Sequence, residues 1–142
     1  MVAKQLSVFI ENRKGRLGEV LGVLKDNNVN IISLSLADTT EYGLLRLIVN
    51  NPEYGKEKLA ADGFSTMLTD VLVLSINHEA GSLQTLLDFL ANNDINVEYM
   101  YGLSIDGNDA YVVLKASNVK TADEILTAKG VKTLSSEDIL KL

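Results

Sequence analysis

Two short loops that end in glycine carry the residues whose types and spacing could bind a small molecule. The first reads Asn12-Arg13-Lys14-Gly15 and the second Asn77-His78-Glu79-Ala80-Gly81, and leucines with helical spacing follow each glycine. A loop that opens a helix presents backbone N–H groups without a partner at the positive end of the helix dipole. A carboxylate fits there, and the asparagine amides can add both donors and acceptors. The sequence therefore predicts that these loops bind a small molecule and do not catalyse a reaction.

An internal repeat relates the two loops. With a constant offset of 66 residues, six positions are identical and three are conservative apolar replacements. Just before the glycine, the match of Asn12 with Asn77 lowers the offset to 65, so Ala80 is interpreted as a one-residue insertion. The matched pairs are Gly15/Gly81, Leu17/Leu83, Leu21/Leu87, Leu24/Leu90, Asn27/Asn93, Asn30/Asn96, Val20/Leu86, Val29/Ile95 and Ile31/Val97.

The elements that position the loops follow from the hydrophobic period, which is two in strands and 3.6 in helices. Each copy has the order βαββαβ, so we predict an α+β fold with two ferredoxin-like modules in tandem, residues 1–68 and 69–142, each an antiparallel sheet with helices on one face. Turns are expected at Thr39-Thr40-Glu41 and Asp106-Gly107-Asn108, and a capped short helix after Ser135 with Ile139 and Leu140 as its docking residues. Expected strands are 5–10, 31–36, 42–49, 65–68, 71–76, 97–105, 111–115 and 131–134, and expected helices are 17–26, 52–62, 83–92 and 122–128.

The stretches from Glu11 to Ile31 and from Asn77 to Val97 resemble the signature of ACT domains, which are regulatory modules that bind amino acids and usually control a metabolic enzyme. The resemblance covers nearly the whole chain. It implies a stand-alone, non-enzymatic, cytoplasmic tandem ACT protein, with a free amino acid as ligand, no cofactor, a homodimeric state and a regulated metabolic enzyme as a possible partner. Lys14 and Ala80 stand where many members of the family have proline.

The two halves of each expected site cannot come from one module. In a βαβ unit the first two strands are parallel, so Asn12 and Asn30 should lie at opposite ends of the sheet. We therefore predict that ligands bind between modules, with Asn12 completed by Asn96 and Asn77 by Asn30. The candidate ligand-binding residues are Asn12, Arg13, Lys14, Gly15, Arg16, Leu17, Asn30, Ile31, Asn77, Glu79, Ala80, Gly81, Ser82, Leu83, Asn96 and Val97.

Several of these residues have a simpler interpretation. Asn30 and Asn96 could be turn residues in the left-handed conformation. Arg16 has Ser82 as its counterpart, which favours an exposed surface arginine. His78 is the only histidine and has no evident catalytic partner, which favours a solvated loop residue.

The second strands differ between the copies on the face away from the helices. There we expect Ser33 and Ser35 in the first copy and Tyr99 and Tyr101 in the second. Two tyrosines on such a face indicate a covered surface. The alternative is a shift of one residue in the register, which would place them in the core.

Composition argues against other classes of function. The formal net charge is −6, with 13 basic and 19 acidic residues, which disfavours nucleic acid and anionic lipid as partners. An RNA-binding module of the same strand order needs aromatic residues on its third strand, and residues 44–48 have none. The chain has no cysteine for a nucleophile or a thiolate metal site, and no apolar run of membrane-spanning length. Neither a catalytic nor a metal site is predicted, and a ligand-free dimerisation module stays open as the alternative.

Overall fold

The computed structural model describes residues 1–38 and 41–142, so two residues of the first expected turn lie outside the described residues. The chain forms two compact units, Lys4–Thr69 and Asp70–Leu142, and Met1–Ala3 join the second. The division falls inside one long strand, β4 (Ser65–Asn77), which replaces the two strands expected at 65–68 and 71–76. The expected boundary after residue 68 also lies within β4. Thr69 and Asp70 contain no glycine or proline to interrupt an extended chain, so the strand continues.

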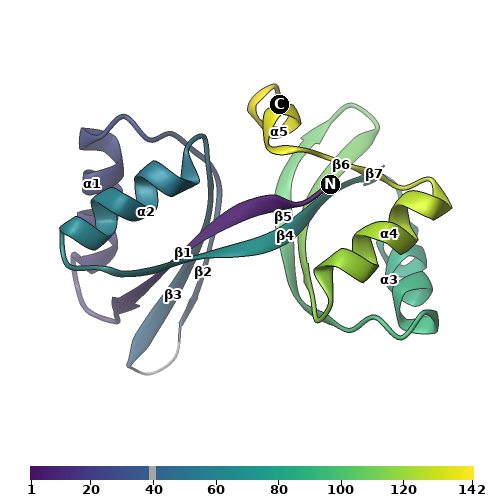
Figure 1. Ribbon diagram of the computed structural model, residues 1–142, viewed down its shortest axis with the longest axis horizontal. Coiled ribbons are helices and arrows are strands. Elements are labelled where there is room, and N and C mark those ends of the chain that lie inside the picture. Colours follow the sequence, from purple (N-terminus) through teal and green to yellow (C-terminus); the bar gives the residue numbers. More distant parts are fainter. Residues whose placement is uncertain (39–40) are drawn as a thin grey trace. The chain divides into compact units, whose positions relative to one another are not determined.

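The first unit has the predicted order of elements (Figure 1). Its strands adjoin in the order β2-β3-β1-β4, with β3 antiparallel to both β1 and β2. The helices α1 and α2 lie on one face of this sheet (Figure 1). The bounds are β1 (Ala3–Glu11), α1 (Arg16–Asp26), β2 (Ile31–Asp38), β3 (Tyr42–Val49) and α2 (Pro52–Ala61).

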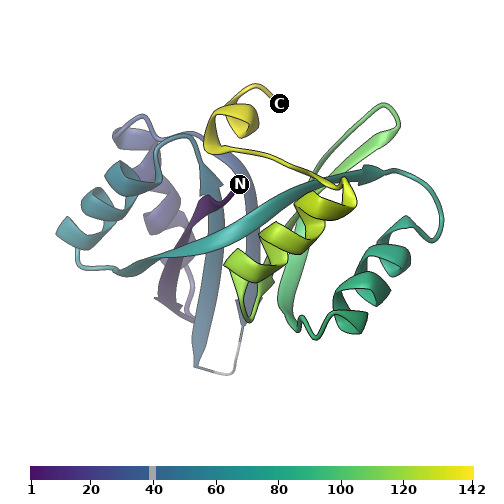
Figure 2. The same cartoon turned by 45° about the vertical axis from the view of Figure 1, so that its right-hand side comes forward.

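The second unit repeats this arrangement, with strand order β7-β4-β6-β5 and antiparallel pairing throughout. Its helices α3 and α4 cover one face of the sheet (Figure 2). The α+β class and the ferredoxin-like order are thus confirmed in both copies. The bounds are α3 (Ser82–Asn92), β5 (Val97–Asp106), β6 (Asp109–Ala116), α4 (Val119–Lys129), β7 (Lys132–Thr133) and α5 (Ser136–Leu140).

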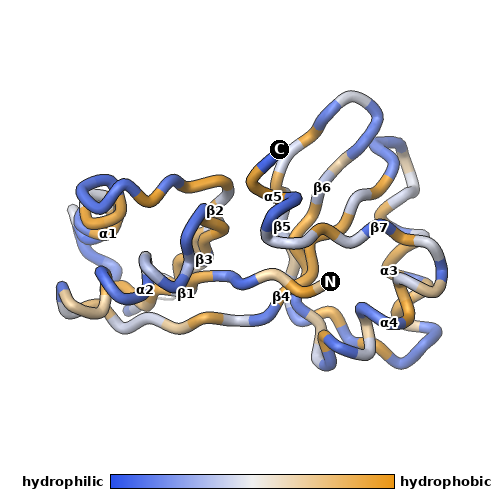
Figure 3. Tube along the Cα trace, turned by 45° about the horizontal axis from the view of Figure 1, so that its top comes forward, coloured by the Kyte–Doolittle hydropathy of each residue, from blue (hydrophilic) through white to orange (hydrophobic). Residues whose placement is uncertain are grey.

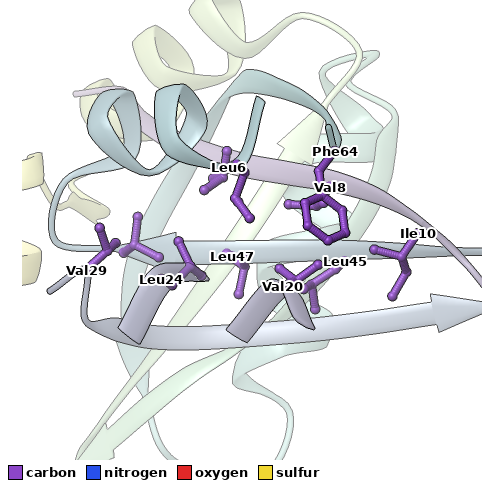
Figure 4. Packing of buried hydrophobic residues seen from close by; sticks show 11 residues of the cluster. Leu6, Val8, Ile10, Val20, Leu24, Val29, Leu45, Leu47 and Phe64 are labelled. Carbon is purple, nitrogen blue, oxygen red and sulfur yellow. The ribbon is translucent and has the colours of Figure 1, made fainter. Parts of the chain in front are cut away.

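Each unit has its own hydrophobic core between its helices and its sheet. Figure 4 shows the first core, where branched side chains of β1, α1 and β3 form one cluster with Phe64. Hydrophobic and hydrophilic residues alternate along the helices (Figure 3), so each helix buries one stripe. None of the helices in the described residues is long and apolar enough to cross a membrane. The first core contains Leu6, Val8, Ile10, Val20, Leu24, Val29, Leu45, Leu47, Val49, Leu59 and Phe64, and the second Leu72, Leu74, Leu86, Leu90, Ile95, Leu114, Ala116, Ala122 and Leu126.

The strand register confirms the face predicted for the two tyrosines. Tyr99 lies opposite Lys115 and Tyr101 opposite Val113, on the face away from α3 and α4. The alternative of a one-residue shift is therefore wrong. Both tyrosines are half-buried, and Val73 and Val113 on the same face are fully buried, so this face is largely withdrawn from solvent.

The corresponding face of the first unit carries the two serines, as predicted. Ser33 lies opposite Ile48 and Ser35 opposite Arg46. This face also buries polar groups, because Gln5 is fully buried and donates a hydrogen bond to Ser7 (3.0 Å). The helix-free faces of the two copies are therefore chemically different although the backbone order is the same.

The tail forms the expected short helix, α5, with a complete capping box. The Ser135 hydroxyl accepts a hydrogen bond from the Asp138 N–H (3.1 Å), and the Asp138 carboxylate accepts one from the Ser135 N–H (3.0 Å). Ile139 is buried as predicted. Leu140 is 54% exposed, so its predicted docking role is wrong.

The capping box predicts a measurable titration. Hydrogen bonds from the backbone N–H and side chain of Ser135 lower the pKa of Asp138. A lowered pKa means that the contribution of this carboxylate to stability is present above its unfolded-state pKa and is lost as the pH falls through the folded-state pKa. We expect a carbon-detected NMR titration to give an Asp138 pKa below the ordinary value of an aspartate, and a higher value in Ser135→Ala. An unchanged value in the variant would contradict this assignment.

Candidate ligand-binding loops

The two glycine loops have the same backbone geometry. Gly15 and Gly81 precede α1 and α3 with φ angles of 84° and 88°, a left-handed conformation that favours glycine. A Cβ atom added to either glycine would meet nothing within 4 Å. The glycines are thus required by their backbone angles, and the space above them is open.

Neither loop caps its helix with a side chain. The helices α1 and α3 have no side-chain hydrogen bond at the N-cap, whereas Asn51, Asn118 and Ser135 cap α2, α4 and α5. No side chain therefore satisfies the first-turn N–H groups of α1 and α3, of which those of Arg16 and Ser82 donate to the carbonyls of Arg13 and Glu79 in the loops. This contrast between the helices supports the binding chemistry predicted for both loops.

The hydrogen bonds in the loops correct the predicted alignment of the repeat. The N–H of Arg13 donates to the carbonyl of Glu11 (2.9 Å), and the N–H of Glu79 donates to the carbonyl of Asn77 (3.0 Å). The next bonds, from Arg16 to Arg13 and from Ser82 to Glu79, are both 3.3 Å long. The offset of 66 therefore continues through the loop, and the interpretation of Ala80 as an insertion is wrong.

His78, and not Asn77, is the structural counterpart of Asn12. The N–H of Asn12 donates to the carbonyl of Glu41 (3.0 Å), and that of His78 to the carbonyl of Asn108 (2.6 Å). Asn77 is the last residue of β4, opposite Asp109. The constant offset of 66 was the signal in the sequence that identifies His78, whereas the identity of Asn12 and Asn77 indicated the wrong counterpart.

Asn30 and Asn96 lie at the far end of each sheet from the loops. The carbonyl of Asn30 accepts a hydrogen bond from the N–H of Asn50 (3.1 Å), just beyond the end of β3, whereas Asn12 bonds Glu41 just before its start. The eight residues of β3 separate these points by roughly 25 Å. The premise that one module cannot bring both asparagines to one small ligand is therefore supported.

The residues with a left-handed backbone lie two positions before Asn30 and Asn96. Asn28 and Asp94 have φ angles of 57° and 59°, and no other non-glycine residue in the described chain has a positive φ. The interpretation of Asn30 and Asn96 as left-handed turn residues is wrong. Their carbonyls instead accept hydrogen bonds from Asn50 and Ser117 (3.1 and 2.9 Å).

Arg16 is not the exposed surface arginine suggested by its counterpart Ser82. Its guanidinium lies over the ring of Phe64, 4.2 Å from the ring centroid, and pairs with Glu19. The side chain is only 19% exposed, and its Nε is buried without a hydrogen-bond partner. Arg13 is more exposed and pairs with Glu11 at 2.8 Å.

The first unit has one cavity at its loop and another at the far end. The loop cavity has a volume of about 320 Å³ and includes Asn12, Arg13 and Leu17 in its lining. The second, of about 310 Å³, is lined by Asn30 and Ile31 together with Leu21, Leu24, Lys25, Asn28 and Val29. The structure therefore places these five predicted residues at two separate cavities.

The second unit has a larger cavity on the other side of its loop, between α3 and the end of α4. Its volume is about 510 Å³. Five of the predicted ligand-binding residues line it, from the end of β4, the loop and the start of α3: Asn77, Glu79, Ala80, Gly81 and Ser82. Leu83 is 40% exposed on α3, and Asn96 and Val97 lie at the opposite end of the sheet.

The described residues contain no group of three or more histidine, aspartate and glutamate side chains that could hold a metal ion. What the loops offer is a set of backbone donors, open space above a glycine and adjoining cavities. Pockets of about 300–1,000 Å³ with a few placed polar groups are typical of small-molecule sites. The arrangement therefore suits reversible binding of a small molecule.

Comparison with known proteins assigns the family. The family model described as an ACT domain pair matches residues 1–142. A crystal structure of a Bacteroides thetaiotaomicron protein is 39% identical, with a TM-score of 0.94 over 100% of this chain and 98% of that one. The regulatory subunit of aspartate kinase from Thermus thermophilus, in a ligand-free form, has a TM-score of 0.64 at 14% identity, over 88% of this chain and 90% of that one, and shares the fold. No curated protein matches the sequence. Since the family model spans the whole chain, the protein belongs to the ACT family as an ACT domain pair.

Proposed function

We propose that this ACT domain pair is an amino-acid sensor that binds its ligand at the glycine loops and regulates a metabolic enzyme. A single observation carries the proposal: in both copies a left-handed glycine opens a helix that no side chain caps, beside a cavity of amino-acid size or larger. The N–H groups of such a helix start would bind the ligand carboxylate. The open space above Gly15 and Gly81 lets the ligand approach the backbone.

The alternatives are less well supported. The third strands, β3 and β6, carry one aromatic residue each, Tyr42 and Tyr111, and the formal net charge is −6, so an RNA-binding sheet is less well supported. A ligand-free dimerisation module would have no need for two uncapped glycine loops. The homodimeric state, the cytoplasmic location and the pairing of loop residues from one module with Asn30 or Asn96 of another stay predictions.

A thermal-shift panel of the twenty amino acids tests the sensor proposal. A ligand at 100 times its Kd stabilises the folded state by about 2.7 kcal/mol. In a chain of this size that corresponds to a shift of several degrees in Tm. We expect at least one amino acid to produce such a shift, and we expect it to weaken in Gly15→Ala or Gly81→Ala.

Gly63→Ala provides the matched control. Gly63 ends α2 with a φ of 90° and also has nothing within 4 Å of an added Cβ, so its substitution carries the same backbone penalty away from the loops. Each of the three variants should lose about 1 kcal/mol of stability. Ligand affinity should fall in a loop variant and stay unchanged in Gly63→Ala. The absence of a shift with any amino acid, in protein shown to be folded, would rule out the sensor function.

A further inference from the structure

The cavity of the second unit has an apolar floor. Ile76, Phe89 and Val131 pack against the core of this unit and also line the cavity, and the buried side chain of Leu86 joins them. The surrounding elements are α3, which carries Leu86 and Phe89, and the end of α4 with the following residues (Figures 1 and 2). A half-buried apolar surface inside a cavity gains free energy when a ligand removes it from water.

Three charged residues line the cavity: Glu79, Lys129 and Lys132. Lys129, at the end of α4, places its Nζ 4.1 Å from the centroid of the Phe89 ring. Glu79 lines the cavity from the glycine loop. Lys132 also belongs to the lining, but it lies opposite Ser75 on β4, and strand alternation directs both side chains to the sheet face away from the core residue Leu74. Lys129 and Glu79 are therefore the charges available to a ligand.

The first unit fills the equivalent position with its own side chains. The hydrogen bond from Phe64 to the carbonyl of Leu59 (3.0 Å) has its counterpart in that from Val131 to Leu126 (2.9 Å), so Phe64 corresponds to Val131. Arg16 corresponds to Ser82.

These two differences in side-chain size change the space at this position in the two copies. In the first unit the guanidinium of Arg16 stacks on the ring of Phe64 between the helices. In the second unit the smaller Ser82 and Val131 line the cavity of about 510 Å³. The space that Arg16 and Phe64 occupy in the first unit is thus left as a cavity in the second, with Lys129 over Phe89 in its lining.

We propose that the cavity between α3 and the end of α4 binds one zwitterionic amino acid with an apolar side chain, so that each chain has a single such site. The apolar side chain lies against Phe89, Leu86 and Val131, the carboxylate pairs with Lys129, and the ammonium pairs with Glu79. This proposal rests on the proposed sensor function and adds the copy that binds and the class of ligand.

Isothermal titration calorimetry of the full chain with L-leucine, L-phenylalanine, L-aspartate and L-lysine tests the ligand class. We expect leucine or phenylalanine to bind with a stoichiometry of one per chain, and at least tenfold more tightly than aspartate or lysine. Lys129→Gln should weaken that binding at least fivefold, whereas Lys120→Gln, an exposed lysine on α4 outside the cavity, should leave it unchanged. Equal effects of the two substitutions, or two equal sites per chain, would overturn the proposal.

A filled variant tests the place of binding. Ser82→Arg/Val131→Phe transfers the Arg16 and Phe64 pair to the second unit and should reduce the affinity at least tenfold. Its circular dichroism and thermal unfolding show whether it is folded, and Lys129→Gln keeps the test decisive if it is not. If leucine and phenylalanine bind the folded filled variant with unchanged affinity, the cavity is not the site. If a charged amino acid binds best, the sensor function survives and the proposed ligand class is wrong.

Discussion

Leu24→Ala is expected to lower the free energy of unfolding by about 3 kcal/mol, and Leu90→Ala by a similar amount. The two leucines are a matched pair of the repeat, each fully buried in the core of its own unit. Each substitution removes three carbon atoms from a close-packed site. The protein loses the free energy gained by burying these atoms, and the surrounding side chains fill the resulting cavity only in part. Both substitutions should therefore be among the most destabilising in the chain.

Urea denaturation followed by circular dichroism would measure both losses. Native-state hydrogen exchange should also show that Leu24→Ala accelerates exchange mainly in residues 4–69, and Leu90→Ala mainly in residues 70–142. Leu83→Ala is the control, because Leu83 is 40% exposed and its truncation should cost less than 1 kcal/mol. A loss below 1 kcal/mol for either core leucine would contradict the packing described for that unit.

Gly55→Leu is expected to destabilise the protein by about 2 kcal/mol or more, because α2 lies close to the core at this residue. A Cβ on Gly55 would stand 3.2 Å from Cδ2 of Leu6 and 3.5 Å from Cδ2 of Leu24. Leucine adds three more carbon atoms beyond that Cβ. The higher helix propensity of leucine offsets only about 1 kcal/mol of the resulting strain.

Gly22→Leu is the matched control for this crowding. Gly22 is also inside a helix, α1, but an added Cβ meets nothing within 4 Å. The same replacement should therefore raise the stability by a few tenths of a kcal/mol to about 1 kcal/mol. Thermal unfolding of both variants would measure the contrast. Equal effects of the two substitutions would show that the close approach of α2 to Leu6 is absent.

The duplicated fold could be predicted because its signals are local. The helical stripe that ends in Leu24 recurs at Leu90, and both residues are core residues as the period requires. The face occupied by Tyr99 and Tyr101 also followed from strand alternation. The continuity of strand β4 could not be predicted from the sequence, because Thr69 and Asp70 are compatible with either a turn or an extended chain.

Some features of the candidate site could also be predicted from local sequence signals, and others could not. The residues of the sequence by themselves determined the glycine loops, since a left-handed residue before an amphipathic helix leaves a local pattern. Hydrogen bonds to the residues just before β3 and β6 decided that His78 is the counterpart of Asn12. Contacts between distant segments also decided that Arg16 stacks on Phe64 in one copy, while Ser82 and Val131 line a cavity in the other. Such contacts depend on which side chains meet after the helices pack on the sheet, so only the tertiary structure could show that the two copies of the repeat differ at this position.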